Sequence, residues 1–398
     1  QSPIPNPQSP IPNPHFIYVL YINFLIYKKN LIMNNINENN KILNISFNQD
    51  NSCFCLSTEK GFKIYDTYPI QTEYEKPMGS LIFAEMYYNS NILALVSGGD
   101  SAKFSPKKLI IWDDALNKVI REINFFKKIK NVKLKKERIY VICEFNLYIF
   151  NLKSAENLEI IDTYENQKGL FSINSDERSD VIAYLKPFDE KENKKGIVVK
   201  IKNYELNCEK EINTKEESIS YICLNNYGNL IAIANEKGNE IKIYSCLNGE
   251  LLNDFHRGKE KAEINYICFD KFNNYLAITS DRGTIHIWSL KGALQKLNDI
   301  KRKISKDIEE NNKEKEYEIE LNNDSNKIND LPSNKKSMFS QNEKSFAKIR
   351  INSNKSICSF QENNIIIVVT FEGKYYQALL DTKHGGDCQI NGEIDLKI

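Results

Sequence analysis

One pattern repeats along the second half of this chain, and it restricts the fold more than any other feature of the sequence. Ser220–Tyr244 and Asn265–Trp288 share a scheme of strand, turn, strand, a turn of acidic residue, basic residue and glycine, and a third strand ending in an aromatic residue. The period is about forty-five residues, which is the spacing of blades in WD40-type β-propellers. Residues 33–398 hold about seven such units once one long insertion is set aside. The sequence therefore predicts a seven-bladed WD40-type β-propeller.

Short apolar or alternating runs, separated by Asn, Asp and Gly turns, extend this pattern beyond the repeat itself. Near the start of the chain these runs are Ile42–Asn48, Ser52–Ser57 and Phe62–Tyr65. No long helical period competes with them before Gly292. We therefore expect an all-β chain.

The balance of charge disfavours one class of function, nucleic-acid binding. The chain carries 54 basic and 53 acidic residues, which gives a formal net charge of +1. Proteins that bind nucleic acid without sequence preference normally carry a basic excess, so we expect no nucleic-acid partner. Any anion-binding site must therefore come from a local cluster of basic residues rather than from the charge of the whole chain.

Metal sites and enzymes have sequence patterns that this chain lacks. Its nine cysteines lie mostly as single residues in apolar runs, without the CxxC or Cys/His spacing of a zinc site. The four histidines are not accompanied by a GxSxG, P-loop or HExxH motif. We therefore expect no metal, no cofactor and no catalytic residue. An odd, unpatterned set of cysteines suits a reducing compartment such as the cytoplasm.

The first thirty-two residues do not fit the repeat. A proline-rich heptapeptide occurs twice in Gln1–Pro14, and the apolar run Phe16–Tyr27 follows it. That run is shorter than the roughly twenty residues that a membrane-spanning helix needs. Met33 stands just ahead of the first strand-like run. We expect residues 1–32 to be a disordered or misassigned upstream extension, with the protein starting at Met33.

Two stretches carry side chains suited to a phosphate group. Phe255-His256-Arg257-Gly258 ends one strand-like run, and Ser280–His286 spans a turn and the start of the next strand. Arginine offers a fixed fork of donors to phosphate oxygens, and serine and threonine hydroxyls add neutral hydrogen bonds. Thr284 and His286 are two residues apart, so on a strand they share one face. Together these residues predict a phosphate-binding pocket.

Each of these residues also has a purely structural interpretation. Thr284–Trp288 is typical of any WD40 strand, so His286 alone favours a structural role. Ser280 and Asp281 are common turn residues, and Arg257 alone is an ordinary surface arginine. Taken one at a time, these residues leave both interpretations open.

The same residues resemble a known family. The motif Phe255-His256-Arg257-Gly258 is similar to the Phe/Leu-Arg-Arg-Gly motif that ends the fifth blade of the PROPPINs, autophagy β-propellers that bind phosphoinositides. Leu95–Asp100 and Ser105–Asp114 resemble blade two, most closely in the branch that contacts the rod-shaped autophagy lipid-transfer protein. Lys344–Lys348 and Gly373–Tyr376 resemble the last two blades. The resemblance covers nearly all of residues 41–389.

The resemblance implies two lipid pockets, each served by one of the two basic residues of the motif. In the second pocket the resemblance assigns phosphoinositide contacts to Arg257, Ser280, Thr284 and His286, and Arg282 lies in the same turn.

The first pocket departs from the family pattern, because His256 replaces its arginine. A reference imidazole has a pKa of about 6.5 and is mostly neutral near pH 7. Asn239 and Lys242 stand where relatives have Thr and Arg, and Lys215 is the nearest match to an upstream His. The lysines would compensate in part as point charges. We expect one effective pocket and one weak or pH-sensitive pocket.

The insertion, residues 291–344, interrupts the sixth unit. Apolar residues recur in it at steps of three or four and basic residues lie between them: Leu294, Leu297, Ile300 and Ile304, with Lys301, Arg302 and Lys303. This pattern predicts a basic amphipathic helix suited to an anionic membrane surface, and the alternative is a solvated charged linker. Asp307–Asp330 is rich in acidic residues and Asn and is predicted to be disordered. In the resembled family the loop at this position inserts into the membrane.

The resemblance implies a phosphoinositide effector that acts as a monomer. It would bind phosphatidylinositol 3-phosphate, and the 3,5-bisphosphate, and recruit the autophagy lipid-transfer protein or other autophagy factors. Its place would be the cytoplasmic surface of preautophagosomal, endosomal, vacuolar or plastid-type membranes, in autophagosome formation or organelle membrane biogenesis. The rival hypothesis is a WD40 scaffold that binds proteins without specific lipid affinity.

Overall fold

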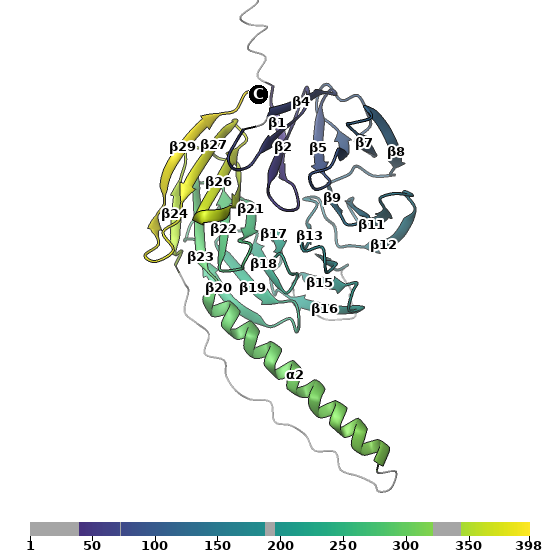
Figure 1. Ribbon diagram of the computed structural model, residues 1–398, viewed down its shortest axis with the longest axis vertical. Helices are drawn as coiled ribbons and strands as arrows, with labels where there is room; N and C mark the ends of the chain where they lie inside the picture. Colours follow the sequence, from purple (N-terminus) through teal and green to yellow (C-terminus); the bar gives the residue numbers. More distant parts are fainter. Residues whose placement is uncertain (1–39, 72, 188–195, 321–343) are drawn as a thin grey trace, which may run out of the picture. The chain divides into compact units, whose positions relative to one another are not determined.

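Seven sheets follow one another around a ring in the described part of the chain, and each is one blade of a β-propeller (Figure 1). The computed structural model describes residues 40–71, 73–187, 196–320 and 344–398, with the backbone alone for 73 and 307–320. Lys41–Lys397 forms one compact unit. Residues 1–32, predicted to be an extension, and Met33, predicted to be the start, lie outside the described ranges. The predicted seven-bladed, all-β fold is confirmed.

The first four blades each consist of four consecutive antiparallel strands. Blade one holds β1 (Ile42–Phe47), β2 (Cys53–Thr58), β3 (Gly61–Asp66) and β4 (Glu73–Pro77). Blade two holds β5 (Leu81–Met86), β6 (Ile92–Ser97), β7 (Lys108–Asp113) and β8 (Lys118–Asn124). Blade three holds β9 (Asn131–Lys135), β10 (Arg138–Ile142), β11 (Asn146–Asn151) and β12 (Asn157–Asp162). Blade four holds β13 (Phe171–Ile173), β14 (Val181–Leu185), β15 (Val198–Asn203) and β16 (Cys208–Asn213).

The last three blades include the one that carries the insertion. Blade five holds β17 (Ile219–Leu224), β18 (Leu230–Asn235), β19 (Glu240–Ser245) and β20 (Leu251–His256). Blade six holds β21 (Ile264–Phe269), β22 (Tyr275–Ser280), β23 (Thr284–Ser289) and β24 (Ala347–Arg350), with the short β28 (Gly386–Asp387) parallel to β24. Blade seven holds β25 (Ser356–Phe360), the 3-10 turn η2 (Glu362–Asn364), β26 (Ile365–Thr370), β27 (Lys374–Leu379) and β29 (Gln389–Asp395).

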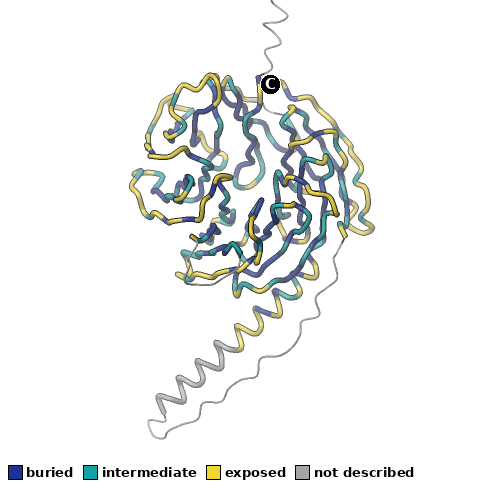
Figure 2. Tube along the Cα trace, turned by 180° about the vertical axis from the view of Figure 1, so that it is seen from behind, coloured by how far each residue is buried: buried dark blue, intermediate teal, exposed yellow. Residues whose placement is uncertain are grey.

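Burial falls from the inner to the outer strands of each blade (Figure 2). All residues of β18 and β26 are buried, because each blade is packed between two neighbours and both faces of its inner strands meet apolar side chains. The outermost strands β8, β12 and β29 are mostly exposed. The core therefore lies between adjacent blades, and the rim of the ring is free to carry polar sites.

Among the described residues, the first and last blades each consist of their own strands and exchange none. The Tyr375 hydroxyl donates to the Thr67 carbonyl at 2.8 Å, and the Tyr65 hydroxyl donates to the Lys397 carbonyl at 2.9 Å. The rings of Phe54 and Tyr375 stack across the same junction. Side-chain contacts therefore join blades one and seven.

The insertion leaves blade six as a helix between β23 and β24. The helix α2 (Lys291–Glu320) begins directly after β23 and lies against β20 of blade five (Figure 1). The helical half of the predicted insertion is therefore confirmed as a helix. The predicted disorder over 307–330 concerns residues whose side chains, and beyond 320 whose backbone, lie outside the described part of the chain.

Candidate functional site

Arg257 follows β20 and reaches across to the neighbouring turns. Its backbone N–H donates to the Asn239 carbonyl at 2.9 Å. Its Nε donates to the Gly238 carbonyl at 2.9 Å, and its Nη2 donates to the Glu260 carbonyl at 2.6 Å. These bonds hold the half-buried guanidinium between two loops, with donors left over for a ligand. Burial lowers the pKa of Arg257, and Asp281 opposes that effect.

His286 lies on β23, and its ring stacks on Trp288 at 5.5 Å between centroids. In the register of β23 with β24, His286 is opposite Lys348 and Thr284 is opposite Arg350. Directly opposed residues of antiparallel strands point to the same face, so two more basic side chains join the predicted site. Burial, together with the positive charges of Lys348, Arg257 and Arg350, lowers the pKa of His286 to about 4.

The turn between β22 and β23 supplies the remaining predicted residues. Ser280 is buried at the end of β22, and its Oγ accepts the Arg282 backbone N–H at 3.5 Å. Arg282 is exposed, and its guanidinium donates to the Lys261 carbonyl at 2.8 Å from Nη2 and 3.3 Å from Nε. Ser280 thus shapes the turn, whereas Arg282 reaches over the loop that follows Arg257.

The structure therefore brings the predicted second-pocket residues to one region of blades five and six, and adds two that sequence reasoning missed. We call this set the Arg257 cluster: Arg257, Ser280, Arg282, Thr284, His286, Lys348 and Arg350. Two carboxylates make loose ion pairs with it, Arg282–Asp281 at 3.9 Å and Arg350–Asp387 at 3.5 Å, and Glu260 is a third negative charge near Arg257. Four cations beside three carboxylates leave an excess of positive charge, which suits an anionic ligand.

The low pKa of His286 predicts an acid-sensitive contribution to stability. The ordinary pKa of 6.5 applies to the unfolded chain, so between pH 6.5 and about 4 the unfolded state takes up a proton that the folded state refuses. The free energy of unfolding is therefore undiminished by this group above pH 6.5, and it falls by about 3 kcal/mol as the pH is lowered to 4. Thermal unfolding of wild type and His286→Gln from pH 7 to pH 4 checks this. The wild-type curve should fall more steeply, and parallel curves would contradict the assignment.

His256, the last residue of β20, lies among carboxylates. Its Nε2 is 3.6 Å from Glu240 Oε1, and its Nδ1 is 3.9 Å from Asp254 Oδ1. That Nδ1 and that Oδ1 are both buried without a hydrogen-bond partner. Burial raises the pKa of Asp254, although Lys242 opposes it. The side chains around His256 are thus mainly negative, whereas positive charge is in excess around Arg257.

Of the other predicted residues of this first pocket, Lys242 and Asn239 already contact other protein side chains, and Lys215 lies exposed on a loop. Lys242 Nζ pairs with Glu216 Oε1 at 2.5 Å and lies 3.5 Å from Glu240 Oε2. Asn239 Oδ1 accepts from Asn235 Nδ2 at 2.9 Å. Lys215 is exposed on the loop before blade five.

We call this second set the His256 cluster: Lys215, Glu216, Asn239, Glu240, Lys242, Asp254 and His256. Three carboxylates outnumber its two lysines. The sequence predicted that Lys242 would replace part of the positive charge of the missing arginine. In the structure Glu216 and Glu240 largely neutralise that lysine.

Comparison with known proteins decides the family. The PROPPIN family profile matches residues 42–394. The chain belongs to the PROPPIN family. Among curated relatives, autophagy-related protein 18 of Yarrowia lipolytica is 26% identical over 87% of this chain and 94% of its own length. Autophagy-related protein 18e of Arabidopsis thaliana is 29% identical over 63% of this chain, and the chain spans 66% of that relative. For autophagy-related protein 18b of the same plant the span is 57% of its length, at 30% identity over 54% of this chain.

Solved structures share the fold of this PROPPIN. Hsv2 of Kluyveromyces marxianus matches with a TM-score of 0.66 and 19% identity, over 90% of this chain and 100% of that one. KlAtg21, solved in complex with the coiled coil of AgAtg16, matches with a TM-score of 0.66 and 20% identity over the same shares. At these identities the likeness concerns the propeller fold.

The apolar face of α2 in this PROPPIN corrects one expectation. Leu297 is 2% and Ile300 6% exposed, and both pack into the core of blades five and six, with Leu294 partly buried beside them. These residues are therefore unavailable to a membrane in this structure. Lys301, Arg302 and Lys303 are exposed and Ile304 is 37% exposed, so membrane contact at this level of the helix stays a prediction. In the described part of the chain no helix has the length and apolarity of a membrane span.

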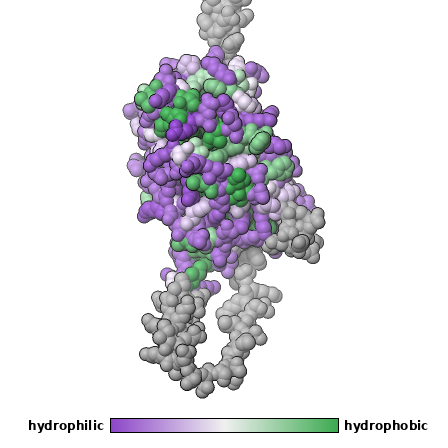
Figure 3. Space-filling view, turned by 90° about the vertical axis from the view of Figure 1, so that its right-hand side faces the viewer, coloured by the Kyte–Doolittle hydropathy of each residue, from purple (hydrophilic) through white to green (hydrophobic). Residues whose placement is uncertain are grey.

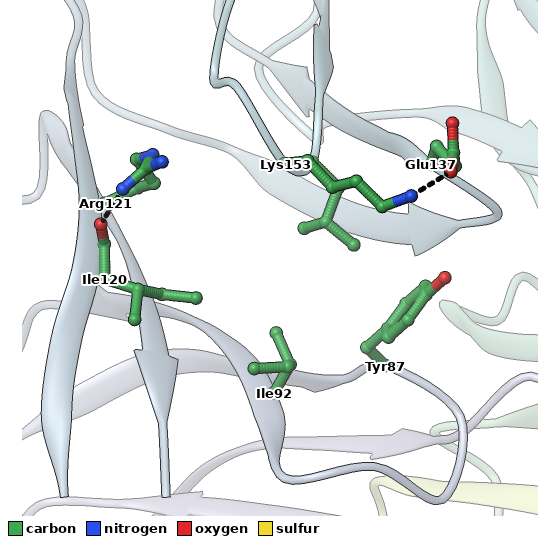
Figure 4. Close-up of a pocket in the computed structure, with 7 residues that line it drawn as sticks. Tyr87, Ile92, Ile120, Arg121, Glu137 and Lys153 are labelled. Carbon is green, nitrogen blue, oxygen red and sulfur yellow. Dashed lines mark hydrogen bonds and ion pairs between the residues drawn. The ribbon is translucent and has the colours of Figure 1, made fainter. Parts of the chain in front are cut away.

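A second candidate site of this PROPPIN is a groove between blades two and three (Figure 4). It has a volume of about 460 Å³ and is lined by Tyr87, Ile92, Ile120, Arg121, Glu137, Leu152 and Lys153. Ile92, Ile120 and Leu152 make part of its lining apolar, and the Lys153–Glu137 ion pair at 2.5 Å lies across from Ile120 and Arg121 (Figure 4). In the side view of Figure 3 apolar side chains form scattered patches among hydrophilic ones. A partly apolar lining with an ion pair suits a protein segment better than a phosphate.

Proposed function

We propose that this PROPPIN binds phosphatidylinositol 3-phosphate, and also the 3,5-bisphosphate, through the Arg257 cluster. The observation that carries the proposal is the gathering of Arg257, Lys348 and Arg350 around His286, where their charges and burial together keep the imidazole neutral. Such an excess of cations at the rim of a protein of balanced charge supports a local anion site. Membership of the PROPPIN family supports a phosphoinositide as that anion.

Each member of the cluster has a distinct part in this binding. Arg257 offers its remaining guanidinium donors to phosphate oxygens, and Lys348 and Arg350 add charge from the opposite strand. Thr284 supplies a neutral hydroxyl. His286 is neutral at cytoplasmic pH because of its low pKa, so it contributes one ring nitrogen as a hydrogen-bond donor or acceptor rather than a charge.

Two contacts with one membrane would strengthen each other. The headgroup binds the Arg257 cluster, and the exposed basic residues Lys301, Arg302 and Lys303 approach anionic lipids, with Ile304 at the interface. Because both contacts belong to one molecule, the second forms at a high effective concentration. The protein would thereby act as a peripheral protein of preautophagosomal, endosomal, vacuolar or plastid-type membranes.

Recruitment of autophagy proteins is the second part of the proposal. KlAtg21 has been solved with the coiled coil of AgAtg16, which supports a protein partner for this chain as well. The groove between blades two and three is the candidate surface, because its apolar lining residues fit side chains of a partner segment. The partner is either an autophagy coiled-coil protein or the autophagy lipid-transfer protein.

A scaffold without specific lipid affinity is the second candidate function. The carboxylates of the His256 cluster favour it, because they oppose one of the family's two phosphate pockets. The groove alone would suffice for such a scaffold.

Vesicle flotation decides between the two functions. Vesicles of phosphatidylcholine are prepared without additions, with phosphatidylinositol 3-phosphate, and with an equal charge of phosphatidylserine. We expect flotation with the phosphoinositide and little with the other two. Equal flotation with phosphatidylserine would indicate charge attraction alone, and no flotation with any vesicle would favour the scaffold.

A further inference from the structure

Three aromatic rings connect the Arg257 cluster with the interior of blade six. Trp288 is fully buried, and its ring lies between two partners. Phe255 stacks on it at 5.5 Å with an interplanar angle of 22°, and His286 stacks on it at 5.5 Å with an angle of 21°. The row therefore joins the strand that leads to Arg257 with the histidine of the anion site.

Helix α2 packs against this row. Ala293, Leu297 and Ile300 belong to the same buried cluster as Phe255 and Trp288. Lys296 Nζ also donates to the Leu252 carbonyl of β20 at 2.5 Å, which ties the helix to the strand itself. The first three turns of α2 are thus part of the propeller core, while the exposed residues 301–306 continue beyond it.

The strand β20 needs such support. It is the outermost strand of blade five, and in the described part of the chain it pairs only with β19. A strand bonded on one edge is held less firmly than an inner strand, so packing on its side decides how well its end is fixed. Phe255 is two residues before Arg257, so the packing of its ring helps to fix the backbone that aims the guanidinium.

We propose that the docked first turns of α2 position the Arg257 cluster for its anion, with Leu297 and Ile300 as positioning residues. The inference concerns the site of the proposed function and rests on that function for the identity of the ligand. By linkage, an event that displaces α2 weakens headgroup binding, and headgroup binding stabilises the docked helix. The same helix carries residues 301–304, so membrane contact and headgroup binding are coupled through one rigid element.

The test uses the full chain with three substitutions in α2. Leu297→Ser removes the apolar contact, Leu297→Met preserves it, and Asn298→Ser changes an exposed residue of the same helix that has no part in the proposed binding. The first readout is affinity for inositol 1,3-bisphosphate, the water-soluble headgroup, in the absence of membrane. The second is hydrogen exchange of the backbone over residues 252–260, which needs no ligand.

We expect Leu297→Ser to weaken headgroup affinity by about tenfold and to speed exchange over 252–260. Leu297→Met and Asn298→Ser should both keep the wild-type affinity and exchange rate. A Leu297→Ser protein that melts earlier, yet matches Asn298→Ser in affinity and in exchange, would overturn the proposal and leave only a structural role. Should Leu297→Ser fail to fold, Ile300→Ser at the edge of the cluster takes its place. A wild type that binds no headgroup refutes the proposed function, and hydrogen exchange then decides the positioning role by itself.

Discussion

Replacing Arg257 with alanine is expected to lower the affinity for vesicles containing phosphatidylinositol 3-phosphate by about ten- to a hundredfold. A charge-assisted hydrogen bond contributes about 1.5–3 kcal/mol, and Arg257 is the arginine whose donors lie deepest in the cluster. The guanidinium also fastens the loops at Gly238 and Glu260, so the substitution loosens the site as well as removing a charge. Flotation and titration with inositol 1,3-bisphosphate measure the loss.

Arg178→Ala provides the matched control for this experiment. Arg178 is an exposed arginine of blade four that pairs with Asp176 at 2.7 Å, and its removal changes the net charge by the same amount. Arg178→Ala should float like wild type. An equal loss in both variants would mean that overall charge, rather than the Arg257 cluster, holds the protein on vesicles.

Rebuilding the His256 cluster is expected to produce the opposite effect. The triple variant Glu216→Gln, Glu240→Gln and His256→Arg removes two carboxylates, releases Lys242 from its ion pairs and restores a fixed cation at the end of β20. Titration should then give two headgroups per protein in place of one. Vesicle affinity should rise by at least about tenfold, because two headgroups on one rigid body act together.

A second triple variant separates this gain from the added charge. Glu122→Gln, Glu156→Gln and Gln167→Arg make the same change in net charge on blades two and three. This control should keep one headgroup per protein. The account of the His256 cluster is wrong if the rebuilt protein still binds one headgroup, or if both triple variants gain vesicle affinity equally.

The sequence predicted the blades well because their inner strands repeat one pattern. Three strands of the first blade follow from apolar runs, whereas the outermost strands β4, β12 and β16 are absent from the predicted set, as are the inner strands β5, β9, β13 and β25. These outermost strands have one neighbour and face water, so their sequences lack the apolar period that marks a buried strand. Each of them pairs antiparallel with the strand before it, because the chain turns back along the edge of the blade.

The candidate site was predictable only where its residues are close in the sequence. Arg257, Thr284 and His286 follow from the resemblance to the PROPPIN motif, and strand alternation places Thr284 and His286 on one face. Lys348 and Arg350 join them by pairing of β23 with β24 across the insertion, a register that no local pattern reveals. The position of Glu240 opposite His256 depends likewise on the register of β19 with β20.

The helix in the insertion illustrates a different limit. Its period of three to four residues predicted an amphipathic helix, and α2 is present. The same apolar stripe fits either a membrane or the side of a blade, because both offer an apolar surface. Leu297 and Ile300 pack into the buried apolar cluster that holds Phe255 and Trp288, and that cluster forms only in the folded protein.

A crystal structure of the protein with inositol 1,3-bisphosphate tests the central claim most directly. The account predicts one headgroup, with phosphate oxygens within hydrogen-bonding distance of Arg257, Thr284 and the β24 side chains Lys348 and Arg350, and none beside His256. A headgroup bound among Glu216, Glu240 and His256, or a crystal at saturating ligand with the Arg257 cluster unoccupied, would contradict it.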